Sequence, residues 1–417
     1  METMTIRSVR SFLLSCPMPE PVRLPYYGGE RTILKRDAML VRIEADGGLV
    51  GWGPGQASER AQRMIEEIVA PFLAGRPAED PDSLCAEFAT LPQASPDVRK
   101  VYAGVELALY DLVGKQRGVP VSELLGGRVR DSILLYGSAG MYQPPEAYAA
   151  EAVGIARLGF SAYKMRPALG PEEDLRTVRL MREAVGPEVD LMVDAHSWWR
   201  MGDRSYSVET VRDLAARMNE YRIAWLEEPL PPDDHAAYRA LRLDGLGPLA
   251  SGEHEPGEES YLDLIRSGAV DYVQADVVCQ GGYPSGRRIL GEVARAGLRF
   301  AFHSWGTDLE VIAAAHLGIC WPETVAEWLE YPVYTTARLR TMYPFPLATE
   351  ILKHPLAIDN GRLHVSDRPG LGVEPEESVI DRYPWIPGPW SLFTLLSPPG
   401  TWSVTADHSV PWAGKGA

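Results

Sequence analysis

The sequence contains few of the features that mark secreted, membrane-spanning or metal-thiolate proteins. Its 417 residues include four cysteines, which are widely separated and form no CxxC pair. This spacing predicts neither a disulfide framework nor a zinc site, so a reducing, cytoplasmic location is expected. No apolar run approaches the roughly 18 to 20 residues that cross a bilayer. The short apolar stretch near the N-terminus is also too brief for a signal-peptide core.

Blocks of basic residues are also missing. The chain has 41 lysines and arginines against 57 acidic residues, a formal net charge of −16. Such a chain is a poor candidate for binding nucleic acid or an anionic membrane, which leaves a small molecule as the expected partner. The hydrophobic fraction of 45% is ordinary for a globular protein. The length suits a barrel of about 250 residues with an added module.

The first 128 residues predict an α+β module. Strands are expected over Ile6–Ser15, Ala38–Ala45 and Gly48–Trp52. Apolar residues then recur at helical spacing in Ala61–Leu73 and Val101–Val113. Strands followed by helices in one stretch are typical of such a module.

From about residue 130, short apolar strands alternate with amphipathic helices. Eight strands are expected, at Ile133–Gly137, Ala162–Met165, Leu191–Asp194, Ala224–Glu227, Leu249–Gly252, Tyr272–Ala275, Phe300–His303 and Val325–Trp328. Eight such units favour a (β/α)8 barrel of the TIM type over an open sheet. The predicted division is a capping domain over 1–128, a barrel over 129–345 and a C-terminal segment over 346–417 that returns to the cap. From about Glu374 this segment is rich in proline and tryptophan, which predicts an irregular tail.

Three consecutive predicted strands end in acidic residues, Asp194, Glu227 and Glu253. Barrel enzymes carry their chemistry at this end of the strands. Converging carboxylates repel one another unless a cation lies among them, and oxygen ligands without cysteine favour Mg²⁺. One such acid is as readily a helix cap or a salt-bridge partner, but three in succession favour a metal site. Glu228 stays ambiguous, because only one of two adjacent strand residues points inward.

The next two strands end in Asp276 and His303. An aspartate that accepts a hydrogen bond from one imidazole nitrogen raises the basicity of the other nitrogen. His303 is therefore a candidate general base, and the alternative is a core histidine bonded to a backbone carbonyl.

Cations and further acids stand at two other strand ends. Lys164 and Arg166 share one face of the second strand and are candidates for binding a carboxylate substrate, or they form a solvated loop pair. Near the eighth strand, either Glu327 or Glu330 could donate a proton toward a developing enolate oxygen, or lie on the surface.

Two glycine-containing stretches, Pro25–Gly29 and Gly51–Gly55, are expected to close over the barrel mouth. Tyr26 and Tyr27 in the first stretch offer hydroxyl contacts to a substrate. Trp305 follows a strand end and is a further candidate for the pocket wall. Plain turn chemistry and packing explain these residues equally well.

The strand-end motifs resemble those of the enolase superfamily, mandelate racemase subgroup. They are Lys-x-Arg at 164–166, Trp-Leu-Glu-Glu-Pro at 225–229, Ser-Gly-Glu at 251–253, Gln-Ala-Asp at 274–276 and Phe-His at 302–303. The resemblance covers nearly the whole chain. It implies that Asp194, Glu227 and Glu253 bind Mg²⁺, that His303 and Asp276 form a catalytic dyad, and that the protein is a homo-oligomer, although the sequence identifies no interface.

The resemblance is closest to the acid-sugar dehydratases. Arg166 replaces the second lysine of the Lys-x-Lys pair of racemases, and an arginine is a poor base. The pattern is similar to rhamnonate dehydratases, while His196 is similar to the leaving-group acid of galactonate-type dehydratases. The implied reaction is removal of the carbon-2 proton of an aldonate or aldarate and loss of its 3-hydroxyl, which gives a 2-keto-3-deoxy acid. Two alternatives stay open: a racemase, epimerase or cycloisomerase that uses Lys164 as a second base, and a non-catalytic Mg²⁺-binding barrel.

Overall fold

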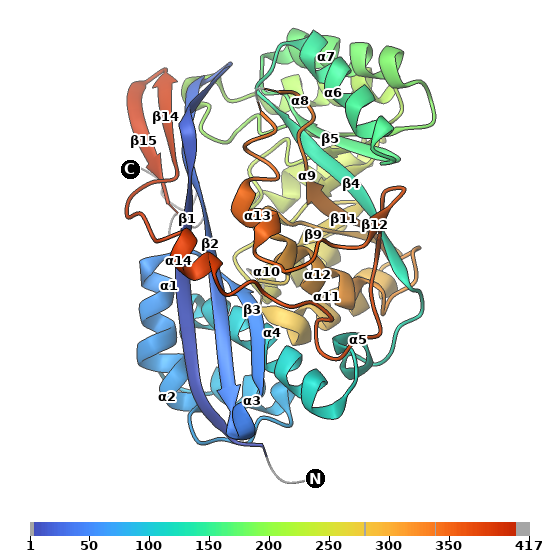
Figure 1. The fold of residues 1–417 in the computed structure, drawn as a ribbon. Coiled ribbons are helices and arrows are strands. Elements are labelled where there is room, and N and C mark those ends of the chain that lie inside the picture. The colour runs from blue at the N-terminus through green and yellow to red at the C-terminus, as the bar shows by residue number, and fades with distance from the viewer. Residues whose placement is uncertain (1–3, 279–280, 338, 406–417) are drawn as a thin grey trace.

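The computed structural model describes residues 4–278, 281–337 and 339–405. A barrel and a capping domain lie side by side, and the C-terminal segment runs back from the barrel to the cap (Figure 1). The predicted fold class, a (β/α)8 barrel with an α+β cap, is confirmed. Among the described residues no helix has both the length and the apolar character needed to cross a bilayer. Cys16, Cys85 and Cys320 are free thiols, and Cys279 lies outside the described residues.

Eight parallel strands form the barrel, and the last pairs with the first to close it. They are β4 (Ser132–Met141), β5 (Ala162–Arg166), β6 (Asp190–Asp194), β7 (Ile223–Glu227), β8 (Leu249–Ser251), β9 (Tyr272–Ala275), β10 (Arg299–Phe302) and β11 (Ala326–Pro332). The helices between them are α6 (Pro145–Arg157), α7 (Pro171–Val185), α8 (Val208–Asn219), α9 (His235–Leu243), α10 (Glu258–Arg266), α11 (Gly282–Arg295) and α12 (Asp308–Gly318).

The barrel interior is a packed layer of side chains, one from each strand. Its members are Tyr136, Ala162, Met192, Trp225, Ala250, Tyr272, Ala301 and Trp328. Because side chains alternate along a strand, the residue two positions further on points to the same interior, one layer closer to the C-terminal mouth. Lys164, Asp194, Glu227, His303 and Glu330 each stand two residues beyond a member of this layer. The strand period therefore places them together at the mouth.

The cap begins with the long hairpin of β1 (Ile6–Tyr26) and β2 (Gly29–Ala45), followed by β3 (Val50–Gly55). Its helices are α1 (Glu59–Met64), α2 (Ala70–Leu73), α3 (Pro81–Ala89), α4 (Pro96–Arg117) and α5 (Val121–Leu124). Helix α4 begins at a Ser95 cap with proline in its first turn and ends at Gly118 in the left-handed conformation. It packs on β3 and supplies more of the buried core residues of the cap than any other element.

The C-terminal segment contains α13 (Pro346–Glu350), β12 (Ile358–Asp359), β13 (Arg362–His364), α14 (Val379–Arg382), β14 (Ser391–Leu396) and β15 (Pro399–Val404). The irregular tail predicted from Glu374 is wrong over 391–404. There, β14 pairs with β2, and β15 pairs with β14. Strands β14 and β15 thus extend the sheet of the N-terminal domain, a pairing that local sequence periodicity does not reveal.

The two stretches expected to close as loops are also regular structure. Tyr26 and Gly29 are a paired position at the tip of the β1–β2 hairpin, so the first stretch is a strand end and a tight turn. The second stretch is strand β3, paired with β2. A Cβ atom at Gly51 would lie 2.2 Å from the carbonyl oxygen of Ala108. Glycine therefore serves close packing of β3 on α4 at this position.

Candidate active site

Two cations and three carboxylates form a buried cluster at the barrel mouth. Lys164 Nζ lies 2.6 Å from Glu227 Oε1, 3.1 Å from Glu330 Oε1 and 3.6 Å from Asp194 Oδ2. Arg166 Nε lies 2.8 Å from Asp194 Oδ2, and its Nη2 donates to Glu330 Oε1 at 3.0 Å. Burial opposes the charge of Lys164, but the neighbouring Glu227 and Glu330 carboxylates raise its pKa well above its usual value. The Lys-x-Arg pair is thus fully engaged, and the solvated loop alternative is excluded.

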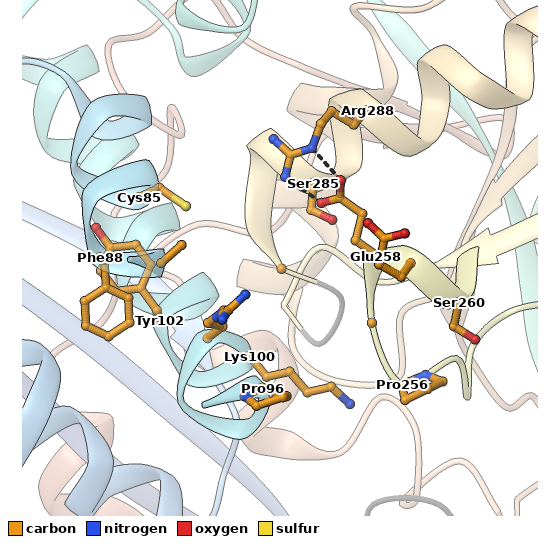
Figure 2. Close-up of a pocket in the computed structure, with 15 residues that line it drawn as sticks. Cys85, Phe88, Pro96, Lys100, Tyr102, Pro256, Glu258, Ser260, Ser285 and Arg288 are labelled. Carbon is orange, nitrogen blue, oxygen red and sulfur yellow. Dashed lines mark hydrogen bonds and ion pairs between the residues drawn. The ribbon is translucent and has the colours of Figure 1, made fainter. Parts of the chain in front are cut away.

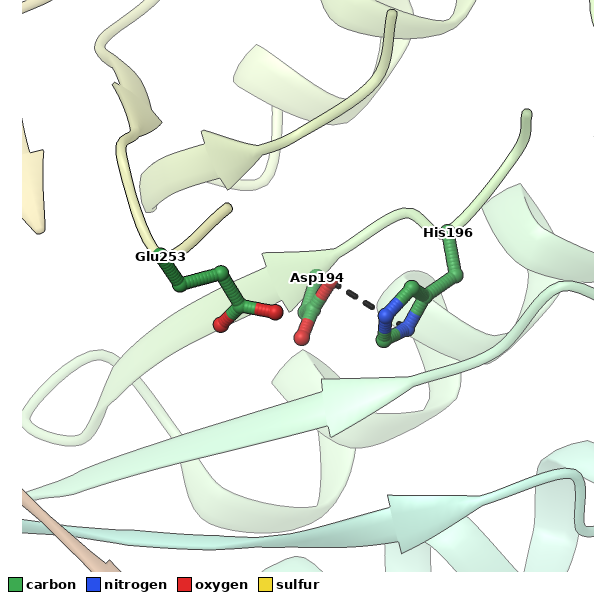
Figure 3. Close-up of side chains that lie close together, drawn as sticks. All are labelled: Asp194, His196 and Glu253. Atoms are coloured by element: carbon green, nitrogen blue, oxygen red, sulfur yellow. Dashed lines mark ion pairs between the residues drawn. The ribbon is translucent and has the colours of Figure 1, made fainter. Parts of the chain in front are cut away.

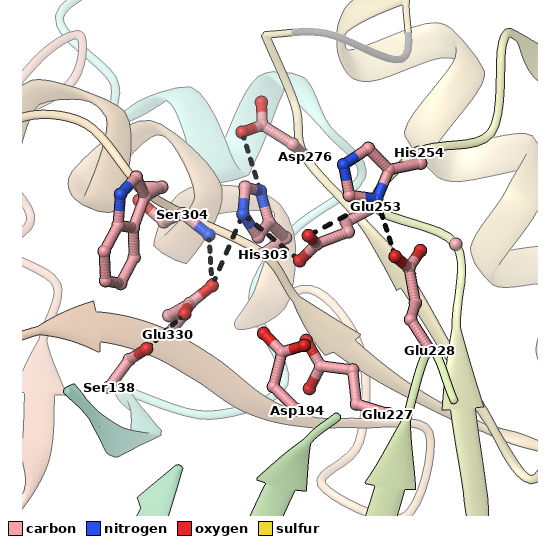
Figure 4. A network of polar contacts seen from close by, with 12 residues as sticks. Ser138, Asp194, Glu227, Glu228, Glu253, His254, Asp276, His303, Ser304 and Glu330 are labelled. Carbon is pink, nitrogen blue, oxygen red and sulfur yellow. Dashed lines mark hydrogen bonds and ion pairs between the residues drawn. The ribbon is translucent and has the colours of Figure 1, made fainter. Parts of the chain in front are cut away.

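His303 lies between acids from three other segments (Figure 4). Its Nδ1 is 3.3 Å from Asp276 Oδ2, and its Nε2 is 3.4 Å from Glu253 Oε2. Burial alone would lower the pKa of His303, but Glu253, Glu330 and Asp276 raise it to about 10. A divalent cation on Glu253 would offset this attraction for the proton. The geometry is that of an oriented imidazole whose second nitrogen faces the cluster.

Of the two acids considered on the last barrel strand, the structure places Glu330 in the cluster. Glu330 accepts hydrogen bonds from the Ser138 hydroxyl and, at 3.1 Å, from the Ser304 backbone N–H. Glu327 instead accepts from the Tyr272 hydroxyl at 2.8 Å and pairs with Arg299. Arg299 is the first residue of β10, so Glu327 lies toward the opposite end of the barrel.

Asp194 is the acid best suited to hold a metal ion. It is fully buried, and neither of its oxygens accepts a hydrogen bond within the described residues. Burial raises its pKa to about 6, although Arg166 and Lys164 act in the opposite direction. A charged carboxylate that is buried and accepts no hydrogen bond is stabilised by a further cation.

Carboxylate and imidazole groups that could hold a divalent metal surround it. Asp194, His196 and Glu253 bring one ligand atom each within 4.8 Å of one another (Figure 3). A second group shares Glu253 and adds Glu228 and His254, whose Nδ1 lies 2.6 Å from Glu228 Oε2. Asp194 and Glu253 of the predicted metal ligands thus lie together.

The third predicted ligand is arranged differently. Glu227 has one oxygen on Lys164 and accepts from the Trp225 indole N–H with the other, at 2.9 Å. It belongs to neither group of possible ligands among the described residues. Burial raises its pKa to about 8, so it too would gain from a nearby cation.

His196 adopts a left-handed backbone conformation with φ of 46°. Its Nδ1 lies 3.4 Å from Asp194 Oδ1, and its ring packs 5.2 Å from that of Trp199. Burial, together with nearby Arg166, holds the pKa of His196 well below its usual value. The neutral imidazole is therefore favoured, which suits a metal ligand better than a proton donor.

The predicted substrate-binding aromatics divide into two kinds. Tyr26 is buried and its hydroxyl donates to the Arg200 carbonyl at 2.5 Å, while Tyr27 is 37% exposed and packs on Tyr206. Neither forms a hydrogen bond or a ring contact with the described residues of the cluster. Trp305 does, because the Arg166 guanidinium carbon lies 4.1 Å from its ring centre.

Some residues of the site escaped sequence reasoning. Ser138, whose hydroxyl lies between Arg166 and Glu330, stands two positions beyond Tyr136 and was within reach of the strand-period argument. His254 directly follows a predicted ligand, but its partner Glu228 was not predicted. No motif or spacing around Arg31 and Arg36 of the cap indicates that they lie near the barrel mouth.

A separate cavity of about 630 Å³ lies between the cap and the barrel. Figure 2 shows it bordered by α3 and α4 on one side and by Pro256–Ser260 and α11 on the other. It contains none of the predicted site residues, and its Arg288 is ion-paired with Glu258. The cluster at the barrel mouth is therefore the candidate active site.

Comparisons with known proteins agree with this architecture. The family model for "Enolase C-terminal domain-like" matches residues 147–379, and that for "Mandelate racemase / muconate lactonizing enzyme, N-terminal domain" matches residues 14–126. D-galactarolactone cycloisomerase of Agrobacterium fabrum is 30% identical over 91% of this chain and 99% of its own. L-rhamnonate dehydratase of Saccharopolyspora erythraea is 31% identical over 83% and 85%. The structure of 3,6-anhydro-D-galactonate cycloisomerase from Zobellia galactanivorans matches with a TM-score of 0.76 and 27% identity, over 91% and 99%.

Proposed function

Because the chain belongs to the mandelate racemase and muconate lactonizing enzyme group of the enolase superfamily, we propose that it is a Mg²⁺-dependent acid-sugar dehydratase. It removes the carbon-2 proton of an aldonate or aldarate and eliminates the 3-hydroxyl as water. The enol that forms then tautomerises to a 2-keto-3-deoxy acid.

The position of His303 carries the proposal. Its Nδ1 is held by Asp276, while its Nε2 faces the carboxylates and cations at the mouth. An imidazole fixed in this way can accept a proton from a substrate bound beside it. A barrel that only bound a metal and a ligand would have little use for an oriented base.

Lys164 and Arg166 bind the substrate carboxylate and stabilise the negative charge that develops when the proton leaves. Both side chains are buried, so their charges act with little screening by water. Glu330 holds Arg166 in place and accepts from the Ser304 backbone, which follows His303 directly. When bound by Asp194, Glu253 and their neighbours, Mg²⁺ supplies Lewis-acid stabilisation of the same charge.

The leaving hydroxyl needs a proton. His303 has just gained one and can return it on the same face of the substrate, in a syn elimination. His196 is the alternative donor, although its neutral state makes it the weaker one. One-base chemistry of this kind agrees with arginine at position 166, since a guanidinium does not give up its proton.

Cycloisomerisation is the second candidate, because two similar proteins carry that activity in their names. It also begins with a single base. The two reactions differ in substrate, since a dehydratase eliminates water from an open-chain acid and a cycloisomerase rearranges a ring without loss of water.

The test is a product assay on a panel of open-chain aldonates and aldarates and of their lactones. We expect 2-keto acid from at least one open-chain acid, loss of that product after EDTA treatment and recovery on addition of Mg²⁺. Isomerisation of a lactone, with no keto acid formed from any open-chain acid, would instead establish the cycloisomerase, and activity that EDTA does not change would contradict the metal site.

A further inference from the structure

Two arginines of the cap are buried without a carboxylate partner. Arg31 and Arg36 belong to strand β2, and their residues are 3% and 4% exposed. Neither forms an ion pair with any acid in the described parts of the chain, and Nε and Nη2 of Arg36 donate no hydrogen bond there. The neighbouring Lys35, by contrast, is paired with Asp37 at 3.0 Å. Buried charges without a counter-charge are costly to folding.

Aromatic rings surround the two guanidinium groups. Both lie on Trp390, with the guanidinium carbons of Arg31 and Arg36 at 5.0 and 5.1 Å from its ring centre. Arg31 also packs on Trp199, and Arg36 packs on Tyr343 at 4.7 Å. Cation–π contacts offset part of the cost of burial, but they supply no hydrogen-bond acceptor for the unpartnered Arg36 nitrogens.

The same rings connect these arginines to the barrel mouth. On one side, Tyr343 lies 4.6 Å from Trp305, and Trp305 lies under Arg166. On the other side, Trp199 borders both Arg31 and His196. The guanidinium groups are thus one ring removed from residues of the candidate active site on both sides.

The charges of all three arginines act on one buried tyrosine, Tyr334. The Tyr334 hydroxyl has no hydrogen-bond partner within the described residues. Burial and the nearby Glu151 raise the pKa of Tyr334, while Arg166, Arg36 and Arg31 all act to lower it. Burial likewise lowers the pKa of Arg31 to about 10, with Arg36 and Arg166 acting in the same direction. Asp194 and Glu330 are ion-paired with Arg166, whereas neither Arg31 nor Arg36 has an ion-pair partner among the described residues.

We propose that Arg31 and Arg36 bind a second carboxylate, at the far end of the substrate, so that the preferred substrates are aldarates. The inference rests on the proposed function for its placement of the first carboxylate at the barrel mouth. A planar guanidinium with unpartnered N–H groups, as in Arg36, matches a carboxylate in geometry and in charge, while Arg31, whose Nε donates to the Ser391 hydroxyl at 3.1 Å, adds its positive charge. A monoacid such as an aldonate would leave this charge unbalanced.

The experiment compares acids that differ only at carbon 6, namely D-galactarate with D-galactonate and D-glucarate with D-gluconate. Binding is measured by calorimetry with Mg²⁺ on the full chain carrying His303→Asn, so that the acids are not consumed. We expect the diacid of at least one pair to bind about 10- to 100-fold more tightly than its monoacid, because charged hydrogen bonds to the second carboxylate contribute binding free energy of this size. Equal binding within both pairs would overturn the proposal.

The variant Arg36→Gln, made in the same background, tests the residue itself. It should lose most of the preference for the diacid and leave monoacid binding within about twofold. Its melting temperature without ligand should be unchanged or raised, because an unpaired buried charge is removed. Arg42→Gln is the matched control, since Arg42 lies on the same strand and is paired with Glu44 at 2.7 Å. It should keep the full preference.

Other outcomes separate the two proposals. If Arg36→Gln weakens both acids equally, Arg36 has only a structural role and the second carboxylate site is wrong. A 6-phosphorylated aldonate that binds more tightly than either diacid would also overturn the carboxylate assignment. If the diacid binds selectively but unmodified protein forms no keto acid from it, the second carboxylate site stands and the dehydratase proposal fails.

Discussion

Arg166 favours reactions that use one base over those that use two. Its guanidinium holds Asp194 and Glu330 together and stacks on Trp305. A lysine in its place could lose a proton and act as a second base, but a guanidinium serves only to bind and to stabilise charge. The residue therefore fixes the geometry of the cluster and favours reactions with one base.

Removing this guanidinium should affect catalysis more than folding. Arg166→Gln is expected to lower kcat/KM by about 10- to 100-fold, because buried Glu330 loses a charged hydrogen-bond donor and buried Asp194 loses an ion-pair partner. Steady-state kinetics on any acid that the product assay identifies will measure the loss. Arg299→Gln is the control, since Arg299 is ion-paired with Glu327 away from the cluster. Equal losses in both variants would indicate a general effect on stability.

Single positions differ in how far the sequence could predict them. Lys164, Asp194 and His303 were predictable, because the strand period carries each of them one layer above a buried interior residue. Glu327 and Glu330 could not be separated, because the predicted strand ended at Trp328 and left the register of Glu330 open. The buried position of Arg31 could not be predicted, because Ser391, which accepts a hydrogen bond from Arg31, is 360 residues away in the sequence.

At the scale of elements, helix α12 links three parts of the chain. His316 near its end is fully buried and accepts from the Ser122 backbone N–H of α5 at 3.2 Å. Its other nitrogen donates to the Leu371 carbonyl of the C-terminal segment at 3.0 Å. These two bonds fix the neutral tautomer and tie the barrel to the cap and to the returning segment.

This histidine predicts acid sensitivity. Burial lowers the pKa of His316 to about 4, below the ordinary value of about 6.5 in the unfolded chain. As pH falls from about 6.5 to 4, His316 binds a proton in the unfolded chain but stays neutral in the folded protein. The free energy of unfolding should therefore decrease, by about 3 kcal/mol if the whole shift is realised. Denaturant unfolding at several pH values will measure it.

His316→Gln should flatten this pH dependence, because it removes the titrating group. The exposed His354, changed to glutamine, should leave the dependence as it is. An unchanged slope in His316→Gln would show that other groups cause the acid sensitivity.

The whole molecule is held together by a sheet that both ends of the chain build. The barrel was predictable because each strand–helix unit carries its own local pattern. The sheet of the cap was not predictable, because β14, which pairs with β2 beside the contact of Trp390 with the two arginines, is separated from β2 in the sequence by the entire barrel. The net charge of −16 argues against polyanionic partners, but it does not reveal that cations gather at the barrel mouth.

The most direct test of the account is exchange at carbon 2 of the substrate. Unmodified protein with Mg²⁺ in D₂O should convert an acid that it dehydrates to the keto acid. NMR will measure the loss of the carbon-2 proton signal and the appearance of the keto acid. His303→Asn should abolish both keto-acid formation and any entry of deuterium into remaining substrate, while Glu327→Gln should retain activity. Continued exchange or dehydration in His303→Asn would contradict His303 as the base.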